Sequence, residues 1–176
     1  MSKSKIFIIT GDREQGKTTL LKKVIPLLKE KRIPINGFYA QGYWENNRRS
    51  RFELTEVNSG ITKPLCEPDL TSGHGFIFNE ETVNWGLTLL KPQTAPALYI
   101  IDEVGKYEVN GKVWHHALQQ LAENKKAFML ITVRKSFIDE VIETFHLSSP
   151  RIFDLSHKPE EISQEIEESF NRFSEA

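Results

Sequence analysis

The chain has 176 residues, of which 39% are hydrophobic and 27% charged, which is typical of a globular protein long enough for one compact α/β domain. Its 23 basic and 24 acidic residues nearly cancel, and this balance argues against binding nucleic acid by bulk charge. The single cysteine, Cys66, excludes an internal disulfide, and the apolar runs are too short for a membrane span or a secretory signal, so we expect a cytoplasmic protein that does not bind a membrane.

The first third of the chain predicts a buried strand, a helix and a β-meander. Residues 5–10 are apolar and largely β-branched, the pattern of a strand buried on both faces of a parallel sheet. Residues 17–31 have leucines at helical spacing. In residues 35–65, aromatic and β-branched segments are separated by polar turns, which indicates a hairpin or meander attached to the main sheet.

The rest of the chain predicts strands alternating with helices. Helices are expected at 79–90, with Asn79 as the cap, at 113–124, and at 159–173. A further helix is expected after Ser136, which would cap it. The strands are expected at 97–101, 127–133 and 152–155. Alternation of this kind is typical of a mostly parallel sheet flanked by helices. We therefore expect an α/β fold in a single domain, residues 1–176, with an inserted or appended β-hairpin.

Residues 11–18 match the pattern G-x-x-x-x-G-K-[ST]. The glycines let the backbone turn so that its amide groups face phosphate oxygens, Lys17 places a charge against the β- and γ-phosphates, and the Thr18 hydroxyl ligates magnesium. The motif lies between a buried strand and an amphipathic helix, the context that confirms it. The predicted binding residues for a nucleoside triphosphate (ATP, GTP or another) are Gly11, Asp12, Arg13, Glu14, Gln15, Gly16, Lys17, Thr18 and Thr19.

The strand at 97–101 is followed by two acids, Asp102 and Glu103. In proteins with this phosphate loop, an aspartate at such a strand end holds magnesium, and a following glutamate activates the attacking water as general base. We therefore predict magnesium as the cofactor, Thr18 and Asp102 as its ligands, and Lys17 and Glu103 as the catalytic residues.

Three neighbouring side chains are open to two interpretations each. Arg13 either reaches a phosphate or is solvated. Thr132, at the end of the next strand, either contacts the γ-phosphate and the water or is buried with a local hydrogen bond. Arg134 either stabilises charge in the transition state or is an exposed arginine after a strand.

Three stretches carry a resemblance to a known family: the phosphate loop, Gly37-Phe38-Tyr39-Ala40, and residues 101–108, which match a family pattern close to D-E-[IV]-G-K-x-E. With them the chain resembles the small P-loop nucleoside-triphosphatase family, which includes human cancer-related nucleoside-triphosphatase and its thermophilic bacterial and archaeal relatives. The resemblance covers residues 5–155. It implies a RecA-like sheet and slow, magnesium-dependent hydrolysis of nucleoside triphosphates with broad base tolerance.

The resemblance also implies that Lys106 and Glu108 belong to the region of the site, whereas their residue types alone fit an exposed loop equally well. The chain departs from the family at a hairpin, where R-x-G-F is replaced by Arg49-Ser50-Arg51-Phe52. With Arg48 these arginines form a basic cluster that either binds a phosphate-bearing second substrate or is a charged hairpin tip.

Hydrolysis of nucleoside triphosphates is the function that these residues support best. One alternative is a small-molecule or nucleotide kinase that uses the same phosphate loop and binds its acceptor near Arg48, Arg49 and Arg51. The other is a nucleotide-dependent binding module whose hydrolysis is incidental. The base preference, the physiological substrate and the oligomeric state are not defined by these patterns.

Overall fold

The computed structural model describes residues 4–176, in which the strands belong to one sheet. The strands are β1 (Ile6–Gly11), β2 (Ile35–Glu45), β3 (Arg48–Glu56), β4 (Thr62–Pro68), β5 (Phe76–Phe78), β6 (Ala97–Val104), β7 (Ala127–Arg134) and β8 (Arg151–Phe153). The helices are α1 (Lys17–Glu30), α2 (Glu80–Leu89), α3 (Lys106–Val109), α4 (His115–Glu123), α5 (Ile138–Thr144) and α6 (Pro159–Ser174). The eight-stranded sheet has the order β5-β4-β3-β2-β6-β7-β1-β8.

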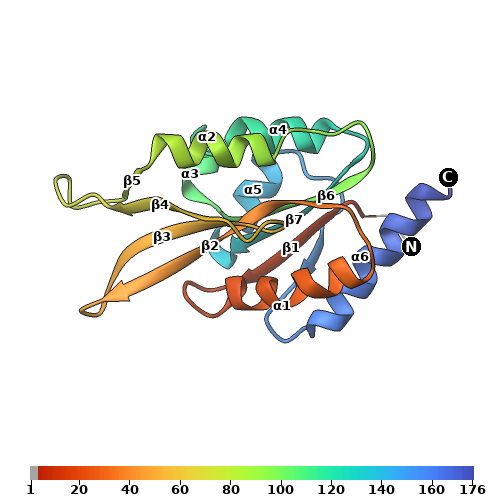
Figure 1. Ribbon diagram of the computed structural model, residues 1–176, viewed down its shortest axis with the longest axis horizontal. Coiled ribbons are helices and arrows are strands. Elements are labelled where there is room, and N and C mark those ends of the chain that lie inside the picture. Colours follow the sequence, from red (N-terminus) through yellow and green to blue (C-terminus); the bar gives the residue numbers. More distant parts are fainter. Residues whose placement is uncertain (1–3) are drawn as a thin grey trace.

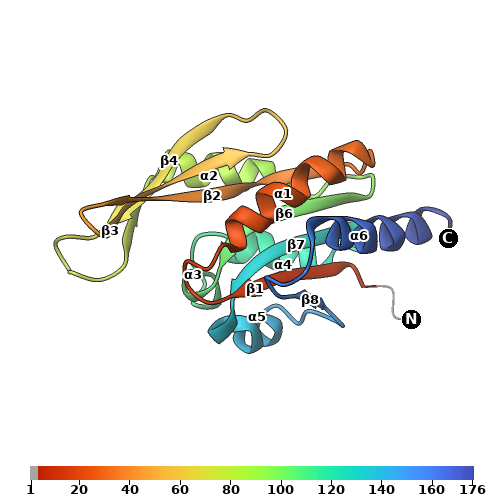
Figure 2. The same ribbon diagram turned by 90° about the horizontal axis from the view of Figure 1, so that it is seen from below.

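The sheet has a parallel half and an antiparallel half that share β2. Strands β2, β6, β7, β1 and β8 pair in parallel, whereas β2, β3, β4 and β5 pair in antiparallel fashion. Residues 35–38 of β2 pair with β6, and residues 38–45 continue as the partner of β3. The turns that join β2 to β3 and β4 to β5 project beyond the helices (Figure 1, Figure 2).

Helices cover both faces of the parallel half. Helices α1 and α6 lie on one face, and α2, α3, α4 and α5 lie on the other (Figure 1). On β6, Leu98 and Ile100 pack in the first of these layers and Tyr99 and Ile101 in the second. Because both faces are buried, this strand has a continuous apolar sequence instead of an alternating one.

The predicted fold class is confirmed, and the structure refines several elements. The predicted meander is present as β2, β3 and β4, and Asn79 caps α2 by accepting a hydrogen bond from the Thr82 amide at 3.0 Å. Ser136 is not a helix cap, because it lies inside a 3-10 turn (Lys135–Phe137) that leads directly into α5. Strand β5 and helix α3 had no counterpart in the sequence prediction.

Strand β6 is longer than predicted, since it continues through Asp102 and Glu103 to Val104. Its pairing with β7 is irregular between Ile101 and Val104, so the two acids lie at a break in the ladder. None of the helices within residues 4–176 is long and apolar enough to cross a membrane.

Candidate functional site

The predicted phosphate loop joins β1 to α1 at the carboxyl end of the parallel strands, where ligands of open α/β sheets bind. Its turn requires left-handed backbone at Gly16 (φ 106°), which glycine adopts readily, and also at Glu14 (φ 63°). Inside the loop, the Asp12 amide donates to the Gln15 side-chain oxygen at 3.0 Å. Gly16 stands directly before α1, so the positive end of the helix dipole faces the loop.

Lys17 is the buried cation of the loop. Its side chain is only 5% exposed, and its Nζ donates to the Asp12 carbonyl at 2.9 Å. Burial is the main cause that lowers the pKa of Lys17, while the neighbouring carboxylate of Glu103 opposes the shift. The ammonium group thus lies across the mouth of the loop, where the resemblance and the motif expect a phosphate.

Asp102 is buried and surrounded by donors. Its carboxylate accepts hydrogen bonds from the Thr18 hydroxyl at 2.9 Å, the Ala40 amide at 2.9 Å and the Thr132 hydroxyl. Burial raises the pKa of Asp102, and these donors oppose the shift because they favour the ionised form. The structure therefore brings the two predicted magnesium ligands, Thr18 and Asp102, into direct contact.

Thr132 is completely buried, and its hydroxyl also accepts a hydrogen bond from the Glu103 amide at 2.8 Å. Of the two interpretations of Thr132, the structure therefore agrees with a buried residue that makes local hydrogen bonds. The residue holds the acid pair on β6 to the neighbouring strand β7 and replaces the ladder bonds that are missing at the break.

Glu103 projects into the pocket and has a positive φ of 62°, which is costly for a residue with a Cβ. Loss of hydration inside the pocket and the adjacent Asp102 carboxylate raise the pKa of Glu103. The cations Lys17, Arg49 and Arg134 oppose this shift, and the resulting pKa is about 7. A carboxyl group with this pKa is suited to accept a proton at neutral pH.

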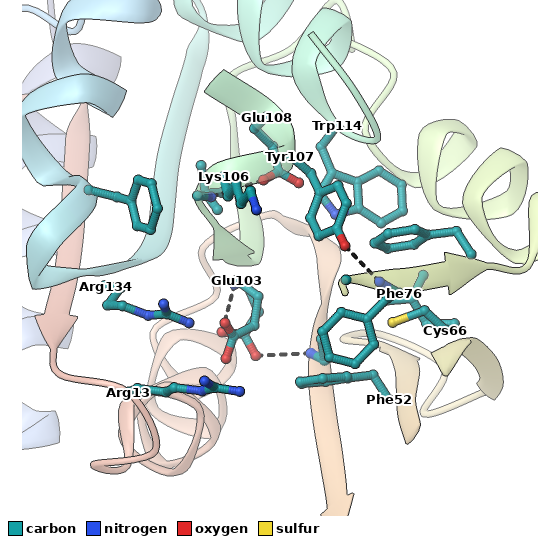
Figure 3. A pocket seen from close by; sticks show the side chains of 18 of the residues that line it. Arg13, Phe52, Cys66, Phe76, Glu103, Lys106, Tyr107, Glu108, Trp114 and Arg134 are labelled. Atoms are coloured by element: carbon teal, nitrogen blue, oxygen red, sulfur yellow. Dashed lines mark hydrogen bonds between the residues drawn. The ribbon is translucent and has the colours of Figure 1, made fainter. Parts of the chain in front are cut away.

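The pocket beside Glu103 has a volume of about 330 Å³ and lies between the phosphate loop, strands β3 to β5 and helix α3. On one side of it, Arg13 and Arg134 point toward Glu103, and on the other side stand Phe52 and Phe76 (Figure 3). Arg13 is mostly exposed and lies 3.5 Å from the Glu14 carboxylate, so its side chain is solvated and ion-paired at the rim.

Lys106 and Glu108, which only the resemblance had connected with the site, both line this pocket. Glu108 is 3% exposed, and its carboxyl group accepts a hydrogen bond from the Gly105 amide at 2.9 Å. Burial raises the pKa of Glu108 to about 8. It is therefore a buried, mainly protonated acid at neutral pH and not part of an exposed loop.

The three arginines of β3 do not act as one cluster. Arg48 is exposed near the hairpin tip, and Arg51 stacks on Tyr43 and lies 3.3 Å from the Glu53 carboxylate. Arg49 instead turns back to the phosphate loop, where its guanidinium group lies 3.4 Å from the Glu14 carboxylate.

Arg49 is the functional candidate that residue patterns did not separate from its neighbours. It stacks against Trp44 and Phe52 and lines the pocket together with Lys17 and Glu103. A second hollow of about 230 Å³, which includes Gly16, Thr18 and Thr19, shares these lining residues. The match of Arg49 to the family pattern R-x-G-F was the available signal.

The donor set of the site fits a magnesium ion. No group of three or more histidine, cysteine or acidic side chains placed to hold a metal is found within residues 4–176. Magnesium, however, is commonly bound through one or two carboxylates together with waters and substrate phosphates. The Thr18 hydroxyl and the Asp102 carboxylate, 2.9 Å apart at the phosphate loop, are hard oxygen donors of this kind.

Comparison with known proteins agrees with the geometry. A model of the protein family described as NTPase matches residues 6–166. The chain is 32% identical over 131 residues to the nucleoside-triphosphatase THEP1 of Caldivirga maquilingensis, covering 73% of this chain and 75% of that protein. It is 25% identical over 144 residues to the cancer-related nucleoside-triphosphatase homolog of Mus musculus, covering 74% and 75%.

Solved structures share the fold. The solution structure of a human cancer-related nucleoside triphosphatase aligns with a TM-score of 0.65 at 20% identity, over 96% of this chain and 95% of that one. The crystal structure of THEP1 from Aquifex aeolicus aligns with a TM-score of 0.63 at 23% identity, over 92% and 95%. The resemblance expected from the sequence is confirmed: the chain has the P-loop fold and belongs to the NTPase family.

Proposed function

We propose that the protein hydrolyses nucleoside triphosphates with magnesium, releasing a nucleoside diphosphate and phosphate. The observation that carries the proposal is the hydrogen bond between Thr18 and Asp102 at the phosphate loop, with Glu103 directly beside it. Membership in the NTPase family supports the same reaction, because the relatives are named nucleoside-triphosphatases.

Four residues of the site have separate roles in this reaction. Thr18 and Asp102 would hold magnesium, which would neutralise negative charge on the phosphate groups. Lys17 exchanges its bond to the Asp12 carbonyl for the terminal phosphate. Glu103 takes a proton from a water molecule, whose oxygen attacks the γ-phosphorus while the bond to the β-phosphate oxygen breaks.

Arg49 faces the same phosphate from β3. Its guanidinium group lies against the Glu14 carboxylate, and a bound triphosphate competes for it with three or more negative oxygens. We therefore assign Arg49 to stabilise the charge that develops on the transferred phosphoryl group.

The experiment is phosphate release with magnesium from ATP, GTP, CTP and UTP. Lys17→Ala and Glu103→Gln are each expected to lower release by at least about 100-fold. Loss of Lys17 removes a cation that stabilises the charge on the transferred phosphoryl group, and loss of the Glu103 carboxylate removes the general base. Nucleotide binding persists in Glu103→Gln. Lys23→Ala, an exposed lysine of the same helix α1, is the matched control and keeps full activity. Full activity in Glu103→Gln would remove Glu103 from the mechanism.

A further inference from the structure

The pocket beside Glu103 is larger than hydrolysis needs. A water molecule occupies about 30 Å³ in the liquid, whereas the pocket has a volume of about 330 Å³. Sites for small organic ligands begin at about 300 Å³. The γ-phosphate takes up the part of this volume beside Lys17, and the part beside the aromatic residues is open to a second small molecule.

The wall opposite the phosphate loop is aromatic. The rings of Phe52 and Phe76 pack edge to face with their centroids 5.4 Å apart, and those of Phe78 and Tyr107 do so at a centroid distance of 4.9 Å. The Tyr107 hydroxyl accepts a hydrogen bond from the Phe76 amide at 2.8 Å, which ties α3 to β5 and fixes this wall (Figure 3). Edge-to-face pairs around a cavity present ring faces and edges against which a planar ring packs well.

A bound triphosphate balances the positive charge of the pocket before any second molecule enters. Five of the pocket's lining residues are cationic, namely Arg13, Lys17, Arg49, Lys106 and Arg134. The acids that oppose them are Glu14, Asp102 and Glu103, because Glu108 is mainly protonated at neutral pH. Arg13 and Arg49 are ion-paired with Glu14, and a bound triphosphate takes up the positive charge that remains. A second anion would gain little here, so the charge balance favours a neutral molecule.

Two acids of the pocket lie apart, Glu103 nearer the phosphate loop and Glu108 nearer Trp114 (Figure 3). Glu103 stands next to the phosphate loop, where a hydroxyl group would take the place of the attacking water. Glu108, buried and bonded to the Gly105 amide, offers a carboxyl group beside the aromatic wall, where the polar edge of a heterocyclic ring would meet it. A planar base at one end and a hydroxyl group at the other describe a nucleoside.

We propose that this pocket is the acceptor site of a second activity, in which the γ-phosphoryl group passes to a hydroxyl group of a nucleoside. Glu103 takes the hydroxyl proton, the hydroxyl oxygen bonds to the γ-phosphorus, and the bond from that phosphorus to the β-phosphate oxygen breaks. The products are a nucleoside monophosphate and a nucleoside diphosphate. The activity rests on the triphosphate binding at residues 11–18 proposed above.

The test supplies ATP and magnesium to the full chain, with and without adenosine, guanosine, cytidine, uridine or thymidine, and separates ADP, phosphate and nucleoside monophosphate by chromatography. At least one nucleoside is expected to raise ADP formation about tenfold or more. The additional ADP is then matched by nucleoside monophosphate and not by free phosphate.

Two variants of β5 locate the acceptor. Phe76→Leu removes a ring from the pocket wall and is expected to raise the KM for the nucleoside about tenfold. Ile77→Ala is the matched control, because Ile77 is the next residue of the strand, is 53% exposed and does not line the pocket. Hydrolysis of ATP without nucleoside, measured in parallel, reports whether each variant is folded.

Equal amounts of ADP and phosphate with every nucleoside would overturn the proposal while leaving hydrolysis intact. Transfer that is unchanged in Phe76→Leu would likewise remove the acceptor from this pocket. Absence of ADP with and without nucleoside contradicts the hydrolytic function itself, so the two failures are distinguishable.

Discussion

The acid pair on β6 is held by backbone strain and buried hydrogen bonds. Glu103 has a left-handed backbone, and its amide donates to both the Thr132 hydroxyl and the Asp102 carboxylate. Strain of this kind costs about 1–3 kcal/mol and persists only where the surroundings impose it. Here it turns the Glu103 side chain toward the pocket while Asp102, one residue earlier, stays buried against Thr18.

Arg49 is the single side chain of β3 on which hydrolysis should depend. Arg49→Ala is expected to lower kcat by about 10–100-fold, since removal of one group that stabilises transition-state charge has effects of at least this size. Affinity for a nucleoside diphosphate, which lacks the γ-phosphate, should change by less than about threefold. Steady-state rates and equilibrium binding measure the two quantities.

Arg51→Ala is the matched control, because Arg51 lies two residues along the same strand and pairs with Glu45 and Glu53 outside the site. Added guanidinium ion should restore part of the rate in Arg49→Ala and none in the Lys17 variant. If kcat falls equally in the two arginine variants, Arg49 has only a structural role.

At the scale of elements, local patterns predicted most of the sheet, and long-range pairing explains the rest. Strands β1, β6 and β7 were predictable because strands buried on both faces are apolar throughout. Strand β5 has only three residues, and it is a strand because it pairs with β4, where Cys66 lies opposite Phe78. Helix α3 has four residues, too short for a helical repeat.

The separation of Arg49 from Arg51 also required the structure. In a regular strand, residues two apart share a face, so both arginines would point the same way. The pairing of β2 with β3 shifts between Tyr43 and Trp44, and this bulge brings Arg49 onto the face of Phe52. Bulges re-aim side chains in this manner, and sequence patterns do not locate them reliably.

The junction of β2 with β6 depends on Gly37. Its φ is 107°, and a Cβ added there would lie 2.0 Å from the Ile100 carbonyl oxygen. Gly37→Ala is therefore expected to destabilise the protein by about 2–5 kcal/mol, from backbone strain and overlap together. Because β2 carries Ala40, whose amide bonds Asp102, activity should fall in parallel.

Gly60→Ala is the control, since Gly60 also has a positive φ, of 72°, but nothing lies within 4 Å of an added Cβ. It should cost only the backbone strain, about 1–2 kcal/mol. Urea unfolding of the three proteins measures the difference. Equal losses in the two variants would contradict the close approach of β2 to β6.

At the scale of the whole molecule, the site lies where the two halves of the sheet meet. The phosphate loop, Asp102 and Glu103 come from the parallel half and follow short sequence patterns, so they were predictable. The opposite wall comes from β3, β4, β5 and α3, which approach the loop only when the chain is folded. Thus the phosphate-binding side of the site could be predicted from the sequence, whereas the aromatic side, which β3, β4, β5 and α3 form, could not.

Acids in this junction whose pKa is raised in the folded protein should make stability fall as pH rises. The folded-state pKa of Glu108 is about 8, compared with an ordinary value of 4.5. Folded protein therefore binds more protons than unfolded protein between these values, so the stabilisation is fully present below about pH 4.5 and is lost by about pH 8. Glu103, with a pKa raised to about 7, acts in the same direction.

Glu108→Gln isolates this contribution, because the amide oxygen can still accept the hydrogen bond from Gly105 while no charge forms. The variant should match the original protein near pH 4.5 and exceed it near pH 9 by on the order of 3–5 kcal/mol in unfolding free energy. Glu123→Gln, at an exposed position of the neighbouring helix α4, should leave the pH dependence unchanged. Denaturant unfolding across this pH range provides the measurement. If the Glu108→Gln and original curves stay parallel, Glu108 is ionised at neutral pH and the interior of the junction is more polar than its burial indicates.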